Sequence, residues 1–145
     1  MMPLSKRIAY TVLQCSWGLL QTLAGAAVFL VLAGREHFIY RGAVGTLWRR
    51  GESLSLGMFI FVSEQASPEA RRELCAHEYG HTVQSLILGV FYLPVIALPS
   101  AVWCMMPYFV KRRVRKGISY YSFYPEKWAN RIARKLTGTE FEILI

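Results

Sequence analysis

Two histidines and a glutamate stand close together in the stretch CAHEYGHTVQ, residues 75–84. His77 and His81 are four residues apart, so in a helix their imidazoles lie on one face, one turn from each other, where both can bind one Zn²⁺. Glu78 lies about 100° further around such a helix, within reach of a water on the metal without ligating the metal itself. Zinc lowers the pKa of that water towards about 7, and Glu78 can take its proton as the water attacks a carbonyl. The spacing therefore predicts zinc-dependent hydrolysis.

A catalytic zinc ion also requires a third protein ligand and an open fourth position. The chain contains no aspartate, which narrows the choice of ligand. Cys75 lies on the opposite side of its helix from His77, and Glu69 and Glu73 point away or lie too far along the same helix. The remaining candidates are His37, Glu64, Glu126, Glu140 and Glu142.

Glu126 is the best placed of these candidates, because it stands early in a separate predicted helix. Asn130 follows one turn later, where it can hold that glutamate. His37 is the second choice as a ligand, and could instead donate a hydrogen bond to the reacting oxygen. An aromatic cluster lies beside Glu126, and a tyrosine hydroxyl from it could stabilise an oxyanion next to the zinc. The candidates for this role are Tyr120, Tyr121 and Tyr124.

The residues before the motif predict one membrane-spanning helix and one β-hairpin. Residues 8–33 carry no charge and exceed the roughly 20 residues that a spanning helix needs. This stretch is also too long for a cleavable signal sequence. Residues 37–63 form the predicted hairpin, with strands 38–49 and 53–63 and a turn at 50–52. Alternation from Leu54 to Val62 supports the second strand.

Three further segments follow the hairpin. Ser67, Pro68 and Glu69 have the order of a helix N-terminus, so we expect the helix that carries HEYGH to span residues 68–91. Residues 95–110 are apolar and predict a return segment, and residues 125–137 predict a C-terminal helix. All five elements fit a single α+β membrane domain over residues 1–145.

Composition and charge indicate the class of partner. The chain is 54% hydrophobic, yet its formal net charge is +8, and its densest basic run is Lys111–Lys116. This run directly follows the apolar segment, which predicts contact with anionic lipid headgroups and not with nucleic acid. Neither GxGxxG nor GxxxxGK[ST] occurs, so no nucleotide site is predicted.

The topology must keep both halves of the site on one side of the membrane. A full crossing between Thr82 and Val110 would separate the histidines from Glu126. From His81 to Phe91 a helix rises only about 15 Å, half a bilayer, so a re-entrant hairpin is expected. Fifteen of the seventeen Lys and Arg residues follow the first helix, which favours a site facing the cytoplasm.

HEYGH, with a later glutamate and a small polar residue four positions beyond it, resembles the gluzincin group of HExxH zinc peptidases. The resemblance implies that His77, His81 and Glu126 are zinc ligands and that Glu78 is the general base. In the membrane branch of that group, aspartate usually stands where this chain has Asn130. The group also implies that an edge strand near the metal pairs with an extended peptide. The strings HEYGHTVQSLILG, YLPVIALPS and SYYSFYPEKWANR are similar to small bacterial membrane proteins of unknown substrate.

These observations together predict an integral membrane zinc metalloprotease of the bacterial cytoplasmic membrane, acting on a peptide or membrane-protein substrate near the bilayer surface. Two alternatives remain from the sequence. One is a non-catalytic metal-binding scaffold or sensor, marked by four protein ligands on the zinc. The other is a membrane protein in which HExxH is coincidental, marked by a second segment that spans the bilayer completely.

Overall fold

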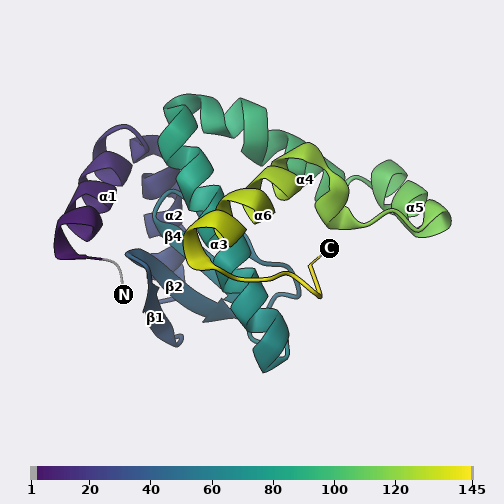
Figure 1. Cartoon of the computed structure of the whole chain (residues 1–145), viewed down its shortest axis with the longest axis horizontal. Helices are drawn as coiled ribbons and strands as arrows, with labels where there is room; N and C mark the ends of the chain where they lie inside the picture. Colours follow the sequence, from purple (N-terminus) through teal and green to yellow (C-terminus); the bar gives the residue numbers. More distant parts are fainter. Residues whose placement is uncertain (1–2, 145) are drawn as a thin grey trace.

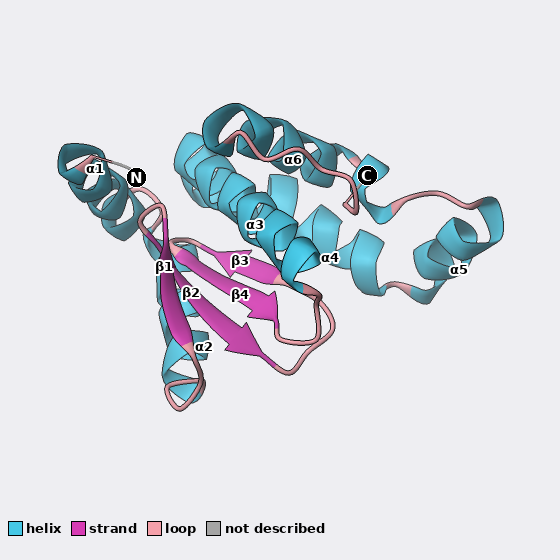
Figure 2. Cartoon of the chain, turned by 60° about the horizontal axis from the view of Figure 1, so that its bottom comes forward, coloured by secondary structure: helices cyan, strands magenta, loops and turns pink. Residues whose placement is uncertain are grey.

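A four-stranded sheet, the long helix α3 and the helix α6 lie over one another as three layers (Figures 1 and 2). The computed structural model describes residues 3–144. Helix α3 spans Pro68–Leu88 and packs between the sheet and α6, which spans Tyr124–Thr137. The arrangement is α+β, as the sequence predicts. Because α3 lies in the middle layer, side chains on its different faces reach quite different surroundings.

The sheet contains two short hairpins instead of the single long one predicted for residues 37–63. Strands β1 (His37–Tyr40) and β2 (Ala43–Trp48) form the first, and β3 (Leu54–Leu56) and β4 (Phe59–Ser63) form the second. Strands β2 and β4 pair in parallel, which gives the order β1-β2-β4-β3. The prediction of a hairpin turn at residues 50–52 is therefore wrong. That segment instead connects the end of β2 to the edge strand β3.

The second hairpin turn explains why the alternating run from Leu54 to Val62 divides in two. Gly57 follows β3 with a φ of 58°, the left-handed region that favours glycine and starts a two-residue hairpin turn. A Cβ at this position would lie 2.2 Å from the hydroxyl oxygen of Thr22. The tight turn thus depends on glycine both for its backbone and for the approach of the N-terminal helices.

The prediction of one helix over residues 8–33 is also wrong. Helix α1 (Leu4–Ser16) and helix α2 (Leu19–Val31) meet at an angle of 97°. The bend lets two buried glutamines bond to α3, because Gln14 donates to the carbonyl of Thr82 at 3.0 Å and Gln21 donates to the hydroxyl of Ser85 at 2.8 Å. Buried amides need such partners, and a straight helix would not aim both at α3.

Helix α3 begins as predicted. The hydroxyl of Ser67 accepts from the backbone N–H of Ala70 at 3.2 Å, and Pro68 occupies the first turn, where a missing N–H costs nothing. Beyond Leu88 the chain passes through the 3₁₀ turn η1 (Gly89–Phe91) and the π-helical turn η2 (Leu93–Ala97).

The chain then reverses, as the predicted return segment requires. The turn η2, helix α4 (Leu98–Met105) and helix α5 (Pro107–Lys116) span residues 95–110 and continue past them. Pro94, Pro99 and Pro107 each lie in the first two positions of a helical segment, where the missing N–H of proline costs no helical hydrogen bond. A last 3₁₀ turn, η3 (Tyr120–Ser122), leads into α6, whose bounds agree with the predicted 125–137.

No single helix within residues 3–144 is long and apolar enough to cross a membrane. Two bent pairs meet that requirement by length and composition: α1 with α2, and Pro68–Phe91 with Leu93–Met105, the second bent by 119°.

Candidate metal centre

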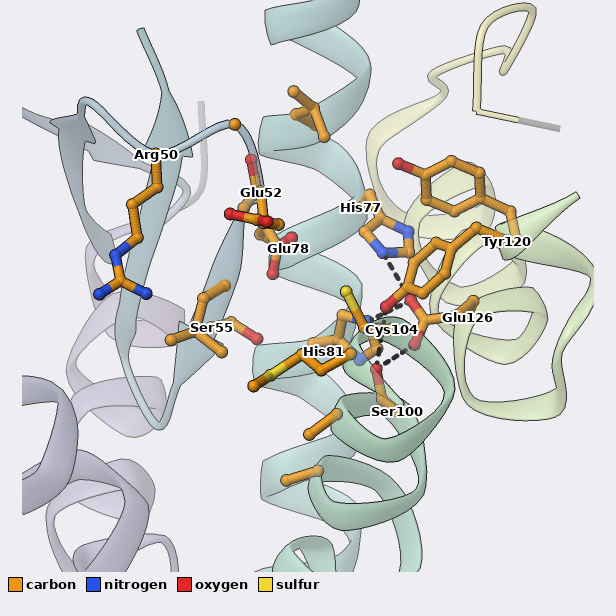
Figure 3. Close-up of a pocket in the computed structure, with 18 of the residues that line it drawn as sticks. Arg50, Glu52, Ser55, His77, Glu78, His81, Ser100, Cys104, Tyr120 and Glu126 are labelled. Carbon is orange, nitrogen blue, oxygen red and sulfur yellow. Dashed lines mark hydrogen bonds and ion pairs between the residues drawn. The ribbon is translucent and has the colours of Figure 1, made fainter. Parts of the chain in front are cut away.

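Three side chains from α3 and α6 point their donor atoms at one place. His77 and His81 come from successive turns of α3, with ring centroids 4.7 Å apart, and Glu126 comes from the first turn of α6. The Oε2 atom of Glu126 lies 3.0 Å from Nε2 of His77 and 3.1 Å from Nε2 of His81 (Figure 3). All three residues are buried, so this convergence lies inside the fold and not on its surface.

The donor set fits a metal ion. One nitrogen from each histidine and one carboxylate oxygen all lie within 4.8 Å of one another. Donors around a tetrahedral zinc at about 2.0–2.1 Å are about 3.3–3.4 Å apart, so the observed 3.0 and 3.1 Å need only a small opening. Two imidazoles and one carboxylate are also the ligands of known catalytic zinc sites. His77, His81 and Glu126 could therefore hold a metal ion and leave a fourth position free.

Close packing of α6 on α3 brings Glu126 to the histidines. A Cβ on Gly80 would lie 2.3 Å from the carbonyl oxygen of Ala129, a separation that real Cβ atoms do not show. The two helices thus approach each other closely at Gly80, one residue before His81. The glycine of HEYGH therefore matters to the site, because it lets α6 pack close enough to α3 for the carboxylate of Glu126 to reach the two histidines.

Each of the three donors is held by a neutral partner on its other side. Nδ1 of His77 lies 2.6 Å from Oδ1 of Asn130, and Nδ1 of His81 lies 2.7 Å from Oε1 of Gln84. The hydroxyl of Ser100 donates to Oε1 of Glu126. The prediction that Asn130 holds Glu126 is therefore wrong, because the amide faces His77 instead. Such partners fix the ring orientation and leave Nε2 to face the metal position.

A cavity of about 520 Å³ opens beside these donors. Its walls are formed by β3 and the segment that joins it to β2, by α3, by the turn η2 with α4, and by η3. Glu78 lies in this cavity between α3 and β3, next to Ser55 and one residue from the donor His77 (Figure 3). The apolar part of the lining is contributed by Trp48, Leu54, Leu74, Ala97, Ala101 and Met105.

The two glutamates have opposite electrostatic surroundings. Burial raises the pKa of Glu78 to about 7, a larger effect than the lowering by neighbouring His77. Burial acts in the same direction on Glu126, but its contacts with His81 and His77 outweigh burial and hold the pKa of Glu126 well below its usual range. In the metal-free protein Glu126 is therefore a fixed anion, whereas Glu78 can exchange a proton near neutral pH. A carboxylate that stays charged is suited to binding a cation, and one that titrates near neutral pH is suited to proton transfer.

Two of the three candidate tyrosines lie at the cavity. The hydroxyl of Tyr120 is 3.0 Å from Oγ of Ser100, and the ring of Tyr121 packs edge-on against His77 with centroids 5.1 Å apart. Burial raises the pKa of both tyrosines, so their hydroxyls remain protonated donors. Tyr124 does not line the cavity, and its hydroxyl donates to the carbonyl of Val95.

The structure does not bring His37 to the cavity. Its ring nitrogens lie 3.0 Å from the hydroxyl of Thr46 and 3.1 Å from the carbonyl of Ala33, and its ring packs on Phe29. The other alternative ligands, Glu64, Glu140 and Glu142, do not line the cavity either. Glu64 pairs with Arg35 and Arg49, and Glu140 pairs with Arg134. The backbone N–H of Glu142 donates to Glu73.

Sequence reasoning missed several residues of the site. Gln84 could have been found, because it stands three positions after His81 on the same helical face. Ser100 and Ser55 carry no comparable signal, since they reach the site from other elements. Glu73, which the sequence sets aside as a ligand, accepts hydrogen bonds from the backbone N–H groups of residues 142–144.

Comparison of the chain with models of known families, with curated proteins and with solved structures finds no match. The resemblance to gluzincins thus rests on the motif residues alone and remains an expectation.

Proposed function

We propose that this protein is a membrane-integrated zinc metallopeptidase. The single observation that carries the proposal is the convergence of His77, His81 and Glu126 on one point, with Glu78 beside it in a cavity large enough for part of a peptide. A purely structural cluster would have no reason to place a second buried carboxyl group at an open cavity, since burying a carboxylate costs free energy.

Zinc, when bound, supplies a Lewis acid that activates water and polarises the scissile carbonyl. The chain supplies the other parts of the reaction. His77, His81 and Glu126 fix the position of the reacting centre. Glu78 takes a proton from the attacking water and returns it to the leaving nitrogen, so it acts first as base and then as acid. Tyr120 supports the developing oxyanion, because its hydroxyl lies at the cavity next to Ser100.

The edge of the sheet provides a place for the substrate backbone. Among the described strands, β3 pairs only with β4, so its other edge keeps unpaired N–H and C=O groups. Leu54 and Ser55 of this strand line the same cavity as Glu78. An extended peptide that adds to β3 would pass the metal position. In this mode of binding the affinity comes mainly from hydrogen bonds to the peptide backbone and depends less on the identity of its side chains.

Exposed apolar side chains support insertion in a bilayer. Soluble proteins rarely expose apolar patches of more than a few hundred Å². In the proposed arrangement α1, α2 and the reversal from Leu86 to Met106 lie in lipid, while Lys111–Lys116 contacts anionic headgroups on the cytoplasmic side of a bacterial membrane. The exposed large apolar residues of these segments include Leu4, Ile8, Val12, Trp17, Leu20, Leu23, Leu30, Val31, Ile87, Phe91, Val95, Leu98 and Met105.

The metal content of the protein tests the proposal. Protein purified in mild detergent, without a chelator or a histidine tag, is expected to hold about one zinc ion per chain. Glu126→Ala should lose the metal, whereas Glu140→Ala, a matched change at an exposed glutamate of an ion pair with Arg134, should keep it. Absence of bound metal even after zinc is added would refute the proposal. Four protein ligands on the bound zinc would instead indicate a non-catalytic scaffold.

A further inference from the structure

The segment that follows α6 is tied to α3 by a buried carboxylate. Both oxygens of Glu73 accept backbone N–H groups, Oε1 from Glu142 at 3.0 Å and from Ile143 at 3.2 Å, and Oε2 from Ile143 at 3.0 Å and from Leu144 at 2.9 Å. The ion pairs between described residues do not include Glu73. Its charge is therefore balanced mainly by three successive backbone donors.

Apolar packing holds the same segment in place. Phe141 and Leu144 are buried and pack with Ala76 of α3 and Ala133 of α6. We call residues 139–144 the C-terminal strap. The strap packs against both α3 and α6, the two helices that carry the candidate metal donors. Glu73 binds it one helical turn before His77.

The strap also decides which way Asn130 faces. The carbonyl of Leu144 accepts a hydrogen bond from Nδ2 of Asn130 at 2.8 Å. An amide that donates on one side must present its oxygen on the other, so Oδ1 faces Nδ1 of His77 at 2.6 Å. The imidazole then keeps its proton on Nδ1 and leaves Nε2 for the metal position.

We infer that Glu73 is a positioning residue for the metal centre, acting through the strap and Asn130 on His77. Its carboxylate is essential to this role. A glutamine at position 73 would have to turn its NH₂ group towards backbone N–H donors, because both carboxylate oxygens are already accepting. The strap would loosen, the carbonyl of Leu144 would leave Asn130, and the amide would no longer hold the ring of His77. The part of this inference that concerns zinc rests on the proposed function, whereas the part that concerns His77 does not.

The experiment compares Glu73→Gln with Glu140→Gln, the same change at an exposed position of the strap. The first readout is the exchange rate of the imidazole Nδ1–H protons in metal-free protein, measured by ¹⁵N-edited NMR. In Glu73→Gln the Nδ1–H of His77 should exchange at least about tenfold faster. The Nδ1–H of His81 should not change, because its partner is Gln84 on the same helix.

The second readout is zinc affinity, measured with zinc alone by competition with a chromophoric chelator. Glu73→Gln should lower the affinity about tenfold, as expected when an outer partner of a ligand is lost. Asn130→Ala should give a similar loss. The double variant should bind no more weakly than Asn130→Ala, because Glu73 acts through that amide.

Each outcome decides the inference. Unchanged exchange at His77 overturns it, and so does equal loosening of His77 and His81, which would mean a general loss of packing. If Glu73→Gln fails to fold, Glu73→Asp keeps both acceptor oxygens on a shorter side chain, and it must still loosen His77 alone. Wild-type protein that binds no zinc would refute the proposed function, while selective loosening of His77 would still support the strap. Normal zinc affinity in both wild type and Glu73→Gln would refute the part of the inference that concerns zinc and leave the proposed function standing.

Discussion

Helix α3 carries two buried polar clusters that differ in kind. The metal cluster consists of His77, Glu78, His81 and Glu126. The glutamine cluster consists of Gln14, Gln21, Thr22, Thr82 and Ser85, where α1 and α2 dock on the C-terminal half of α3. Both form on α3 within a few turns of each other, the first with a residue of α6 and the second with residues of α1 and α2. One contains only neutral groups, and the other contains four titratable ones.

The surroundings of the two clusters explain this difference. In the glutamine cluster the amide N–H groups end on backbone carbonyls and a hydroxyl, which is how buried neutral groups fasten one helix to another. In the metal cluster three donors converge and the fourth group faces a cavity. Burying charged groups is costly, so the second arrangement supports the proposed function, whereas the first fastens helices together. The following changes would break or sharpen that distinction.

The largest effect is expected for Glu78→Gln. Loss of the proton-transfer group should lower peptide hydrolysis by about 10²- to 10⁴-fold while leaving zinc bound, because Glu78 is not among the converging donors. The measurement is turnover of a fluorogenic peptide together with metal content. Full activity in this variant would remove the reason for separating the two clusters.

Gly80→Ala should have the next largest effect. The added methyl group would meet the carbonyl of Ala129 and force α6 away from α3. We expect a loss of about 1–3 kcal/mol in unfolding free energy. Zinc affinity should fall about tenfold or more, because Glu126 moves with α6. Denaturant unfolding and zinc competition measure the two effects, and unchanged zinc affinity would contradict the role given to this close approach.

Gln21→Met should affect stability and not the metal. The side chain keeps its length but loses hydrogen bonds to Ser85 and to the carbonyl of Gly89. Each lost bond should cost about 1 kcal/mol of unfolding free energy. Zinc affinity is expected to stay within about twofold of wild type. A substantial loss of zinc would show that the clusters are coupled and not separate.

The smallest effect is expected for Asn130→Asp. A carboxylate opposite His77 makes the imidazole a stronger donor, so zinc affinity should rise by up to about tenfold. The same change leaves the glutamine cluster untouched, and Gln84 still holds His81. A fall in affinity would indicate that the hydrogen bond from Asn130 to the strap matters more than the basicity of His77.

Local patterns predicted a large part of this protein. The HEYGH spacing, the start of α3 at Ser67 and Pro68, and the bounds of α6 follow from interactions within one or two helical turns. The sequence also singled out Glu126 as the partner of the histidines, because it stands early in a separate predicted helix.

Long-range contacts decided the rest. The bend between α1 and α2 depends on Gln14 and Gln21 finding acceptors more than sixty residues away, and no periodicity within residues 8–33 reveals them. The parallel pairing of β2 with β4 likewise depends on how two hairpins dock, not on the alternation inside either one.

The same limit applies to the site itself. The sequence by itself determined which residues could bind a metal, because ligand chemistry and helical spacing are local properties. The tertiary structure alone decided that Asn130 faces His77, that Ser100 holds Glu126, and that Glu73 reaches the strap. These are contacts between separate elements, and only the packing of α6, α4 and the strap around α3 creates them.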